Sequence, residues 1–313
     1  MNRPIILTLL TLLPLLAKGQ GEPWAQLPSS AGGREGSPRV GLVLGGGGAL
    51  GAAHIGVLQT LEKAGIRIDY IAGTSIGAVV GGLYATGYKA SQLDSLFRSQ
   101  DWLDLLTDRD SRFSEELYSV HDGMIYIMGI PIMRIKGKGE LPTFDLTRLG
   151  ALRGDSISSR LAQLTHLPDS IGFDALPIPF RCVSFDLLSM EEVVHRSGNL
   201  PEALRASMSL PGIFKPVRTD TQLLVDGGVS DNLPIEVVRQ MGADIVIAVD
   251  LSEKNRHSGA PCDADLCLRP RLDGYDIASF GPKQISHMIR LGRVEALAHM
   301  AEIQTLKRRV EGK

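Results

Sequence analysis

One serine lies in a sequence context that is typical of a nucleophile. Ser75 is the middle residue of Gly73-Thr-Ser-Ile-Gly77, which follows the expected strand 66–72 and precedes the small-residue stretch 78–85. Between a strand and a helix, a G-x-S-x-G sequence holds the serine hydroxyl exposed on a tight turn, and the glycines relieve the crowding. The pattern predicts acyl transfer through Ser75.

A second segment could stabilise the negative charge that forms in such a reaction. Gly45-Gly-Gly-Gly-Ala-Leu-Gly51 follows the apolar run 40–44 and opens a helix, so its backbone N–H groups and the helix dipole favour an anion. Ser75 comes 28 residues after Gly47, which is the length of one strand–helix–strand repeat. Adjacent parallel strands would therefore bring the loop beside Ser75 as an oxyanion hole.

The same glycines also fit a dinucleotide-binding fingerprint, Gly46-x-Gly48-x-x-Gly51. That function needs an acidic residue after the second strand to bind ribose. Asp69 has a suitable spacing but comes before that strand ends, and a nucleotide site needs no serine turn. We therefore expect no nucleotide and no other cofactor.

The third segment, Asp226-Gly-Gly228, follows the apolar run 222–225. Serine needs a partner that accepts its proton, and an aspartate has a low pKa in water, so burial beside Ser75 would have to raise it. Because the carboxyl ends of parallel strands share one edge of a sheet, we expect Asp226 there as the base. The alternative is a simple Asp-Gly turn.

Together these motifs resemble the patatin-like phospholipases across about residues 40–252. The resemblance also covers Ala52-Ala-His-Ile-Gly-Val-Leu58 and Ser207-Met-Ser-Leu-Pro-Gly-Ile-Phe-Lys-Pro-Val217. It implies a three-layer α/β/α fold with a mostly parallel central sheet. It also implies hydrolysis of acyl esters in phospholipids, lysophospholipids or neutral lipids, without a metal.

The resemblance further implies a role for each motif residue. Ser75 is the nucleophile, Asp226 is the proton acceptor, and Gly47 and Gly48 are the oxyanion donors. The wider substrate-binding loop comprises Gly46, Gly47, Gly48, Leu50 and Gly51, and the turn glycines are Gly73, Gly77, Gly227 and Gly228. Many family members carry Arg or Lys where this chain has Leu50, which puts a side-chain contact with a lipid phosphate in doubt.

Two alternative functions use the same motifs. A Ser-His-Asp esterase would need one of the histidines His54, His195, His287 or His299 as its base. His54 follows the glycine loop on a helix, where it is expected to pack or cap locally, and His195 lies on an expected strand with no glycine turn nearby. The last two stand in a helical tail among Arg and Lys. An inactive, exported lipid-binding protein is the other alternative.

The chain around these motifs is organised as one α/β domain. Its net charge of −2 and pI near 6.4 exclude a basic field for nucleic acid. Arg3 and the apolar run 4–17 predict a signal peptide at residues 1–19 and hence export to the periplasm, the membrane or the medium; retention as an anchor is the alternative. We expect a flexible lead-in at 20–39, the catalytic domain at 40–252 and a helical extension at 253–313.

Several elements are expected to position the motifs. The patterns predict helices at 49–64, 91–105 and 201–207, a helix from Pro234 capped by Asn232, and strands at 180–187 and 244–249. The apolar segment 124–135 predicts a hairpin that turns near Gly129 and Pro131. It either covers a sheet edge or, with Lys136 and Lys138, contacts the membrane surface.

The three cysteines have different expected states. Cys262 and Cys267 are five residues apart and could form a disulfide after export. A zinc site would add His257 to this pair, but a fourth ligand is lacking. Cys182 lies in an expected strand and is interpreted as a buried thiol.

Overall fold

The computed structural model describes residues 36–108, 118–121, 124–127, 150, 152–252 and 261–312. The expected signal peptide, His257 and residues 128–138 lie outside these ranges, so the predictions made for them stay predictions. No helix in the described part of the chain is long and apolar enough to cross a membrane.

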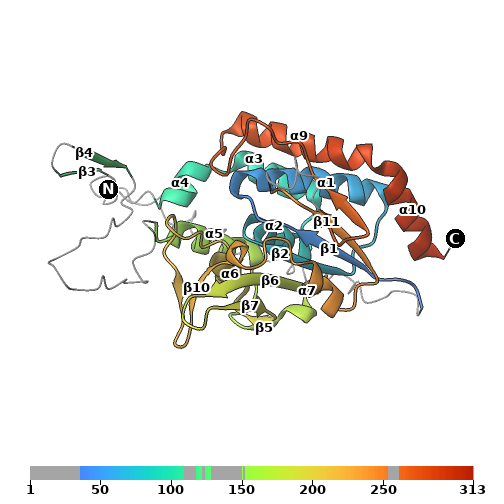
Figure 1. The fold of residues 1–313 in the computed structure, drawn as a ribbon, viewed down its shortest axis with the longest axis horizontal. Helices are drawn as coiled ribbons and strands as arrows, with labels where there is room; N and C mark the ends of the chain where they lie inside the picture. The colour runs from blue at the N-terminus through green and yellow to red at the C-terminus, as the bar shows by residue number, and fades with distance from the viewer. Residues whose placement is uncertain are drawn as a thin grey trace, which may run out of the picture.

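The described residues form an α/β fold around an eight-stranded sheet, as the sequence predicted (Figure 1). The strand order is β12-β11-β1-β2-β6-β10-β9, and β7 pairs with β6 outside this path. The strands are β1 Val40–Leu44, β2 Tyr70–Thr74, β6 Phe180–Asp186, β7 Glu191–His195, β9 Val217–Arg218, β10 Leu223–Asp226, β11 Ile245–Val249 and β12 Leu266–Leu268. Two small two-stranded sheets pair β3 Tyr118–His121 with β4 Met124–Ile127 and β5 Ile171–Gly172 with β8 Ser197–Gly198.

Helices cover both faces of the large sheet. They are α1 Ala52–Ala64, α2 Ile76–Ala85, α3 Ala90–Ser99, α4 Trp102–Thr107, α5 Asp155–Thr165, α6 Leu200–Ser207, α7 Ile235–Gln240, α9 Pro282–Ala298 and α10 Met300–Glu311. Helices α1, α3 and α9 lie together above the sheet in Figure 1, and α7 lies below it. The sheet is therefore the middle of three layers.

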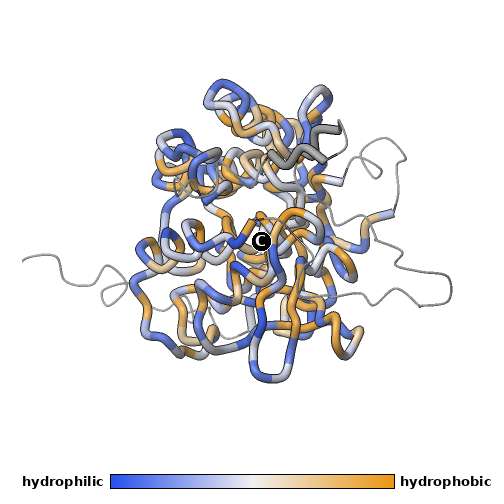
Figure 2. Tube along the Cα trace, turned by 90° about the vertical axis from the view of Figure 1, so that its left-hand side faces the viewer, coloured by the Kyte–Doolittle hydropathy of each residue, from blue (hydrophilic) through white to orange (hydrophobic). Residues whose placement is uncertain are grey.

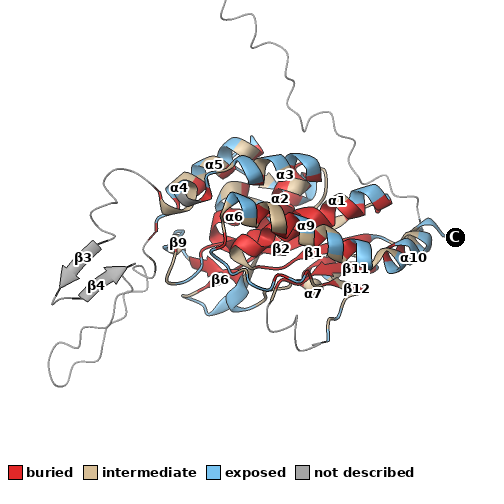
Figure 3. Cartoon of the chain, turned by 90° about the horizontal axis from the view of Figure 1, so that it is seen from above, coloured by how far each residue is buried: buried red, intermediate tan, exposed pale blue. Residues whose placement is uncertain are grey.

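The sheet separates a large core from a small one. In β1, Leu42 and Leu44 belong to the large core, whereas Val43 belongs to the small core together with Val237 and Val238 of α7. Successive side chains of a strand point to opposite faces, so both faces of β1 and β11 need apolar residues. β1, β2 and much of α2 are accordingly buried (Figure 3). The covering helices carry hydrophobic residues between hydrophilic ones (Figure 2).

The C-terminal segment is built into this fold. β12 pairs in parallel with β11, and α9 buries Ile285, Met288 and Ile289. A Cβ built on Gly56 of α1 would lie 1.9 Å from the Ile289 carbonyl oxygen, and one on Gly292 would lie 1.9 Å from the Ala53 carbonyl oxygen. Two glycines thus let α1 and α9 cross with their backbones in contact. The sequence did not predict the strand β12.

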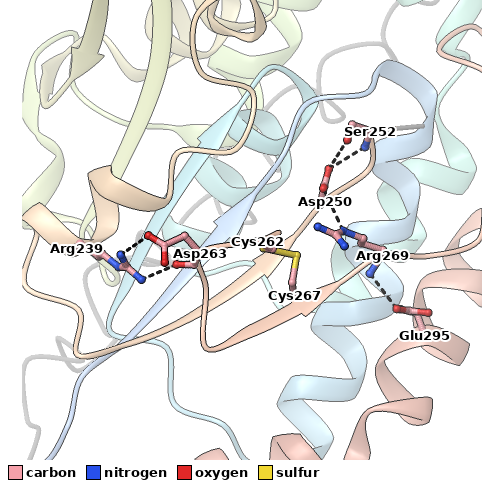
Figure 4. The surroundings of a disulfide bond; sticks show 8 residues. All are labelled: Arg239, Asp250, Ser252, Cys262, Asp263, Cys267, Arg269 and Glu295. Carbon is pink, nitrogen blue, oxygen red and sulfur yellow. Dashed lines mark hydrogen bonds and ion pairs between the residues drawn. A yellow bond between two sulfur atoms is a disulfide. The ribbon is translucent and has the colours of Figure 1, made fainter. Parts of the chain in front are cut away.

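A disulfide joins Cys267, in β12, to Cys262, which precedes this strand (Figure 4). Close by, Arg239 of α7 forms an ion pair with Asp263, with an N–O distance of 2.8 Å. Arg269, just after β12, pairs with Asp250 at 3.3 Å. These contacts hold the edge strand β12 against the end of β11. Because the two sulfurs are bonded to each other, they cannot serve as thiolate ligands for zinc.

Two local expectations were wrong in detail. The helix expected at 91–105 is divided into α3 and α4, because the Asp101 side chain accepts the Asp104 N–H and starts a new helix. Asn232 does not cap α7, whose N-cap is Pro234 without a side-chain bond. The segment 124–127 pairs with the preceding 118–121, whereas the turn predicted near Gly129 and Pro131 lies outside the described residues.

Candidate active site

The turn that carries Ser75 follows β2 and starts α2, as the motif predicted. Ser75 has φ 57° and ψ −127°, a conformation that a residue with a Cβ adopts only at a cost of about 1–3 kcal/mol. A Cβ on Gly73 would lie 2.5 Å from the Gly77 carbonyl oxygen. The turn therefore needs glycine at its start to close this tightly around the serine.

Gly77 brings the glycine-rich loop to the same place. A Cβ on Gly77 would lie 2.1 Å from the Leu44 carbonyl oxygen, so the first turn of α2 packs directly on the end of β1. Since β1 and β2 are adjacent and parallel, the loop after β1 lies beside Ser75. A Cβ on Gly46 would be 3.1 Å from the Ser75 Cβ.

Most N–H groups of this loop already have acceptors. Gly45 donates to the Val249 carbonyl, Gly46 to Asn232, Ala49 to Ile277 and Leu50 to Gly47, with N–O distances of 3.0–3.2 Å. Among the described residues no acceptor is found for the N–H groups of Gly47 and Gly48. Of the five loop residues that the sequence singled out, these two have donors free for an oxyanion.

Close packing around Leu50, Gly51 and Gly48 determines the shape of the loop. The Leu50 side chain is buried in the large core. Gly51 faces Ile76, whose Cγ1 would lie 2.3 Å from an added Cβ. Gly48 has φ 56°, and a Cβ there would meet the Ile277 carbonyl oxygen at 2.5 Å. The loop shape thus depends on the segment before α9, far away in the sequence.

His54 supports the glycine-rich loop through a hydrogen bond. Its Nε2 lies 2.8 Å from the Gly45 carbonyl oxygen and must donate to it, and the ring is fully buried. Burial lowers the pKa of His54 to about 4, although the bond to Gly45 raises it. A neutral ring that donates to a carbonyl is a structural support and cannot at the same time accept a proton from Ser75 through that nitrogen.

Asp226 reaches the serine by a route that the sequence did not predict. β10 is antiparallel to β6, with Asp226 opposite Ser184, whereas β2 is parallel to β6, with Thr74 opposite Val183. β7 occupies the other edge of β6 along 182–186, so β2 and β10 share one edge and run toward each other. Ser75 and Asp226 therefore meet head to head, and the expectation of parallel neighbours was wrong.

The carboxyl group of Asp226 is almost buried, at 3% exposed. Burial raises its pKa above the usual aspartate range, while hydrogen bonds from the Ser75 hydroxyl and the Gly228 N–H lower it in part. The Gly228 bond has an N–O distance of 2.8 Å. The structure thus brings Ser75, at the end of β2, to a carboxylate that holds its proton more tightly than one in water.

The two glycines after Asp226 allow close packing on both sides. A Cβ on Gly227 would lie 2.3 Å from the Val183 carbonyl oxygen, and one on Gly228 would lie 2.9 Å from Asn232 Oδ1. The same Asn232 oxygen would be 2.4 Å from a Cβ on Gly46. The Asn232 side chain, expected to cap a helix, instead lies between the glycine loop and the Asp226 turn.

Three hydroxyl-bearing residues that sequence reasoning did not single out hold these turns. Thr74 donates its hydroxyl to the Asp231 carbonyl at 2.8 Å. Ser207 accepts the Ser75 N–H at 3.0 Å, and the Ser209 carbonyl accepts the Asp226 N–H at 2.9 Å. Ser207 and Ser209 belong to a segment that resembled the family, but only the fold brings them to the two motifs.

The remaining histidines make contacts elsewhere. His195 bonds the Ser184 hydroxyl at 2.9 Å, and burial lowers its pKa to about 4. His287 bonds Tyr275, and His299 lies beside Glu295. In the described ranges no histidine forms a hydrogen bond with Ser75 or Asp226.

Cys182 and the clusters of acidic residues are the other groups that could react or bind a metal. Cys182 is buried and unpaired, and burial raises the pKa of its thiol. Within the described ranges, no group of three or more His, Cys, Asp or Glu side chains is placed to hold a metal ion.

This chain is similar to known proteins in sequence and in fold. Residues 42–239 match the family model named Patatin-like phospholipase. An uncharacterized NTE family protein of Mycobacterium tuberculosis is 36% identical over 216 residues, covering 69% of this chain and 50% of that protein. Human patatin-like phospholipase domain-containing protein 6 is 34% identical over 220 residues, covering 69% of this chain and 14% of the relative.

A lysophospholipase of Mycosarcoma maydis, NTE1, is 35% identical over 212 residues, which is 68% of this chain and 10% of that protein. This chain thus spans half or less of each of these relatives. The crystal structure of VipD from Legionella pneumophila has a similar fold, with a TM-score of 0.53, 15% identity and coverage of 86% of this chain and 67% of VipD. The matched residues include the glycine loop, Ser75 and Asp226, and the chain belongs to the patatin-like phospholipase family.

Proposed function

We propose that this protein hydrolyses acyl esters of membrane lipids by a Ser75–Asp226 dyad. The observation that carries the proposal is the head-to-head meeting of β2 and β10, which brings Ser75 to the buried side chain of Asp226. The free N–H groups of Gly47 and Gly48 lie on the adjacent loop. A nucleophile, its base and oxyanion donors are the groups that acyl transfer requires.

The reaction would proceed in two halves. Ser75 Oγ attacks the ester carbonyl while Asp226 accepts the hydroxyl proton, and the N–H groups of Gly47 and Gly48 bind the oxyanion. Collapse of the tetrahedral intermediate transfers the proton from Asp226 to the leaving alcohol and leaves an acyl-serine. Water then attacks that ester with Asp226 as the base. This step releases the free fatty acid and regenerates Ser75.

The environment of Asp226 suits this role. An aspartate with its usual pKa would hold the serine proton too weakly at neutral pH. Burial raises the pKa of Asp226, which makes the carboxylate a stronger base. Interactions with Ser75 and the Gly228 N–H lower the pKa in part. Hydrolysis should therefore decline as the pH falls through this raised pKa.

The named relatives support a lipid as the substrate. One is a lysophospholipase and another is a patatin-like phospholipase domain-containing protein. Because this chain matches only part of each, its substrate must be measured directly. We expect fatty acid release from phospholipid or lysophospholipid vesicles, detected by mass spectrometry.

The dyad is tested with a soluble chromogenic ester. Ser75→Ala should lower the rate at least about 10⁴-fold, because the nucleophilic oxygen is lost. Asp226→Asn should be nearly as severe, since the amide cannot accept the proton. Both proteins should keep a folded circular dichroism spectrum, and substantial activity in either purified variant would exclude the dyad.

Two histidine variants distinguish the dyad from a triad. His287→Gln and His299→Gln remove the histidines that follow Asp226 in the chain, as the base of a Ser-His-Asp esterase does. We expect wild-type rates from both. A loss comparable to that of Ser75→Ala would favour the triad, and a wild-type protein without any turnover would favour a lipid-binding function.

We also propose that the protein is exported after cleavage near residue 19. The disulfide between Cys262 and Cys267 supports this, since disulfides persist mainly in oxidising compartments. Mass spectrometry of the protein from cell fractions should find a mature N-terminus near Gln20 outside the cytosol. A full-length cytosolic protein with reduced cysteines would contradict export.

A further inference from the structure

The Val183 carbonyl lies where two hydrogen-bond ladders end. In the parallel ladder between β2 and β6, the Ile71 N–H donates to the Pro179 carbonyl at 3.0 Å. Such bonds recur every two residues, so the regular continuation would pair the Ser75 N–H with the Val183 carbonyl. Ser75 cannot continue the ladder, because its φ of 57° turns the chain out of the strand.

A side chain replaces this missing bond. The Ser75 N–H donates to Ser207 Oγ at 3.0 Å, and Ser207 Oγ donates to the Val183 carbonyl at 2.6 Å. Ser207 has no exposed surface, so water does not compete for these groups. The hydroxyl is inserted between the two strands at the point where the chain must leave β2 to present the nucleophile.

The end of α6, which supplies the Ser207 hydroxyl, is held in place by hydrogen bonds. Ser207 is the last residue of α6, which is capped at its start by the Asn199 side chain. Two residues earlier, the buried Arg205 donates to the carbonyls of Arg153 and Lys215. Two residues later, the Ser209 carbonyl accepts the Asp226 N–H. One short segment therefore contacts the main chain of both dyad residues.

We propose that Ser207 is a positioning residue of the reaction. Its hydroxyl replaces the last hydrogen bond of the β2–β6 ladder and so holds Ser75 Oγ next to Asp226. The proposal rests on the proposed function, because it assumes that Ser75 is the nucleophile. Ser207 touches neither the substrate nor the reacting atoms. Its loss should slow the chemical step and leave substrate binding unchanged.

The expected size follows from the geometry. Without the hydroxyl, the Ser75 N–H and the buried Val183 carbonyl both lose their partner, and the serine turn is free to move. Misplacement of a reacting group by about 1 Å can reduce a rate about 100-fold. We therefore expect Ser207→Ala to lower kcat by about 10- to 100-fold with KM within twofold of wild type.

The experiment compares Ser207→Ala with Ser207→Thr, which keeps the hydroxyl, and with Thr165→Val. Thr165 is also buried and donates its hydroxyl to a main-chain carbonyl, that of Leu161 at 3.0 Å, so it reports the effect of losing such a bond elsewhere. Rates are measured with a soluble ester and by modification of Ser75 with a fluorophosphonate, read by mass spectrometry. Thermal denaturation checks that each variant is folded.

The proposal expects slow labelling and low kcat in Ser207→Ala, recovery in Ser207→Thr and wild-type rates in Thr165→Val. Labelling of Ser207→Ala at the wild-type rate, or a rise in KM without a change in kcat, would overturn it. If Ser207→Ala does not fold, Ser207→Cys fills the same volume with a weak hydrogen-bonding group, and it must then be slower than Ser207→Thr. A wild-type protein that is not labelled at Ser75 would instead overturn the proposed function and this proposal together.

Discussion

At the carboxyl edge of the sheet and at the crossing of α1 with α9, glycines bring two backbone segments into contact. At the crossing, Gly56 and Gly292 join regular helices and bury apolar side chains. At the edge, Gly46, Gly73 and Gly77 surround a strained serine and lie near a buried carboxyl group. The same residue type supports stability in one region and accommodates costly, reactive geometry in the other.

This difference has a testable consequence. Substitutions at the crossing should reduce stability, and activity should fall only because less protein is folded. Substitutions at the edge should reduce activity, and several should leave stability unchanged or increase it. Strain and buried charge are expected where they support chemistry, because the rest of the fold supplies the free energy to hold them.

The largest expected effect on stability is that of Gly292→Ala. The added methyl group would lie 1.9 Å from the main-chain oxygen of Ala53, and only a shift of a whole helix can relieve this contact. We expect a loss of about 3 kcal/mol in the free energy of unfolding, measured by urea denaturation. Gly172→Ala is the control, since nothing lies within 4 Å of its added Cβ. Similar stabilities of the two variants would contradict the close crossing.

Gly46→Ala should show the opposite pattern. Its methyl group would meet Asn232 Oδ1, the end of a side chain that can rotate, and would lie 3.1 Å from the Ser75 Cβ. We expect kcat/KM for a soluble ester to fall about 100-fold, which corresponds to about 2.7 kcal/mol. The melting temperature should change by less than 3 °C. A matched loss of stability and activity would mean that the glycine loop belongs to the rigid core.

Asp226→Asn should stabilise the inactive protein at neutral pH by about 0.5–2 kcal/mol, because a buried charge is removed. The folded-state pKa of Asp226 is raised, so the wild type has its full stability below the pKa of an unfolded aspartate. That contribution is lost as the pH rises through the raised pKa. The two proteins should therefore melt alike at low pH and diverge as the pH rises. The reverse trend would show that hydrogen bonds to the carboxylate outweigh its burial.

The smallest expected effect is that of Ser75→Gly compared with Ser75→Ala. Both remove the nucleophile, but only glycine adopts φ 57° without strain. We expect Ser75→Gly to be more stable than Ser75→Ala by about 1 kcal/mol in urea denaturation. Equal stabilities would show that the serine turn stores little strain.

Local patterns in the sequence determined much of the catalytic edge. The apolar run before Gly45, the helix expected at 49–64 and Gly73-Thr-Ser-Ile-Gly77 predicted a parallel unit that brings the glycine loop beside Ser75. The structure has this arrangement, with the helix at 52–64. The prediction was possible because a strand–helix–strand unit with short connections has one favoured handedness. The place of Asp226 after an expected strand made it a candidate base, and the resemblance to the family supported that choice.

Only the tertiary structure decided how Asp226 arrives and what holds the dyad. The direction of β10 depends on its register with β6 and on β7, which occupies the other edge. The same holds for Ser207, whose partners Ser75 and Val183 lie 132 and 24 residues away. Hydrophobic periodicity reports which face of a strand is buried, but it contains no information on which strands are neighbours. Contacts between such distant segments follow from the packing of the whole sheet.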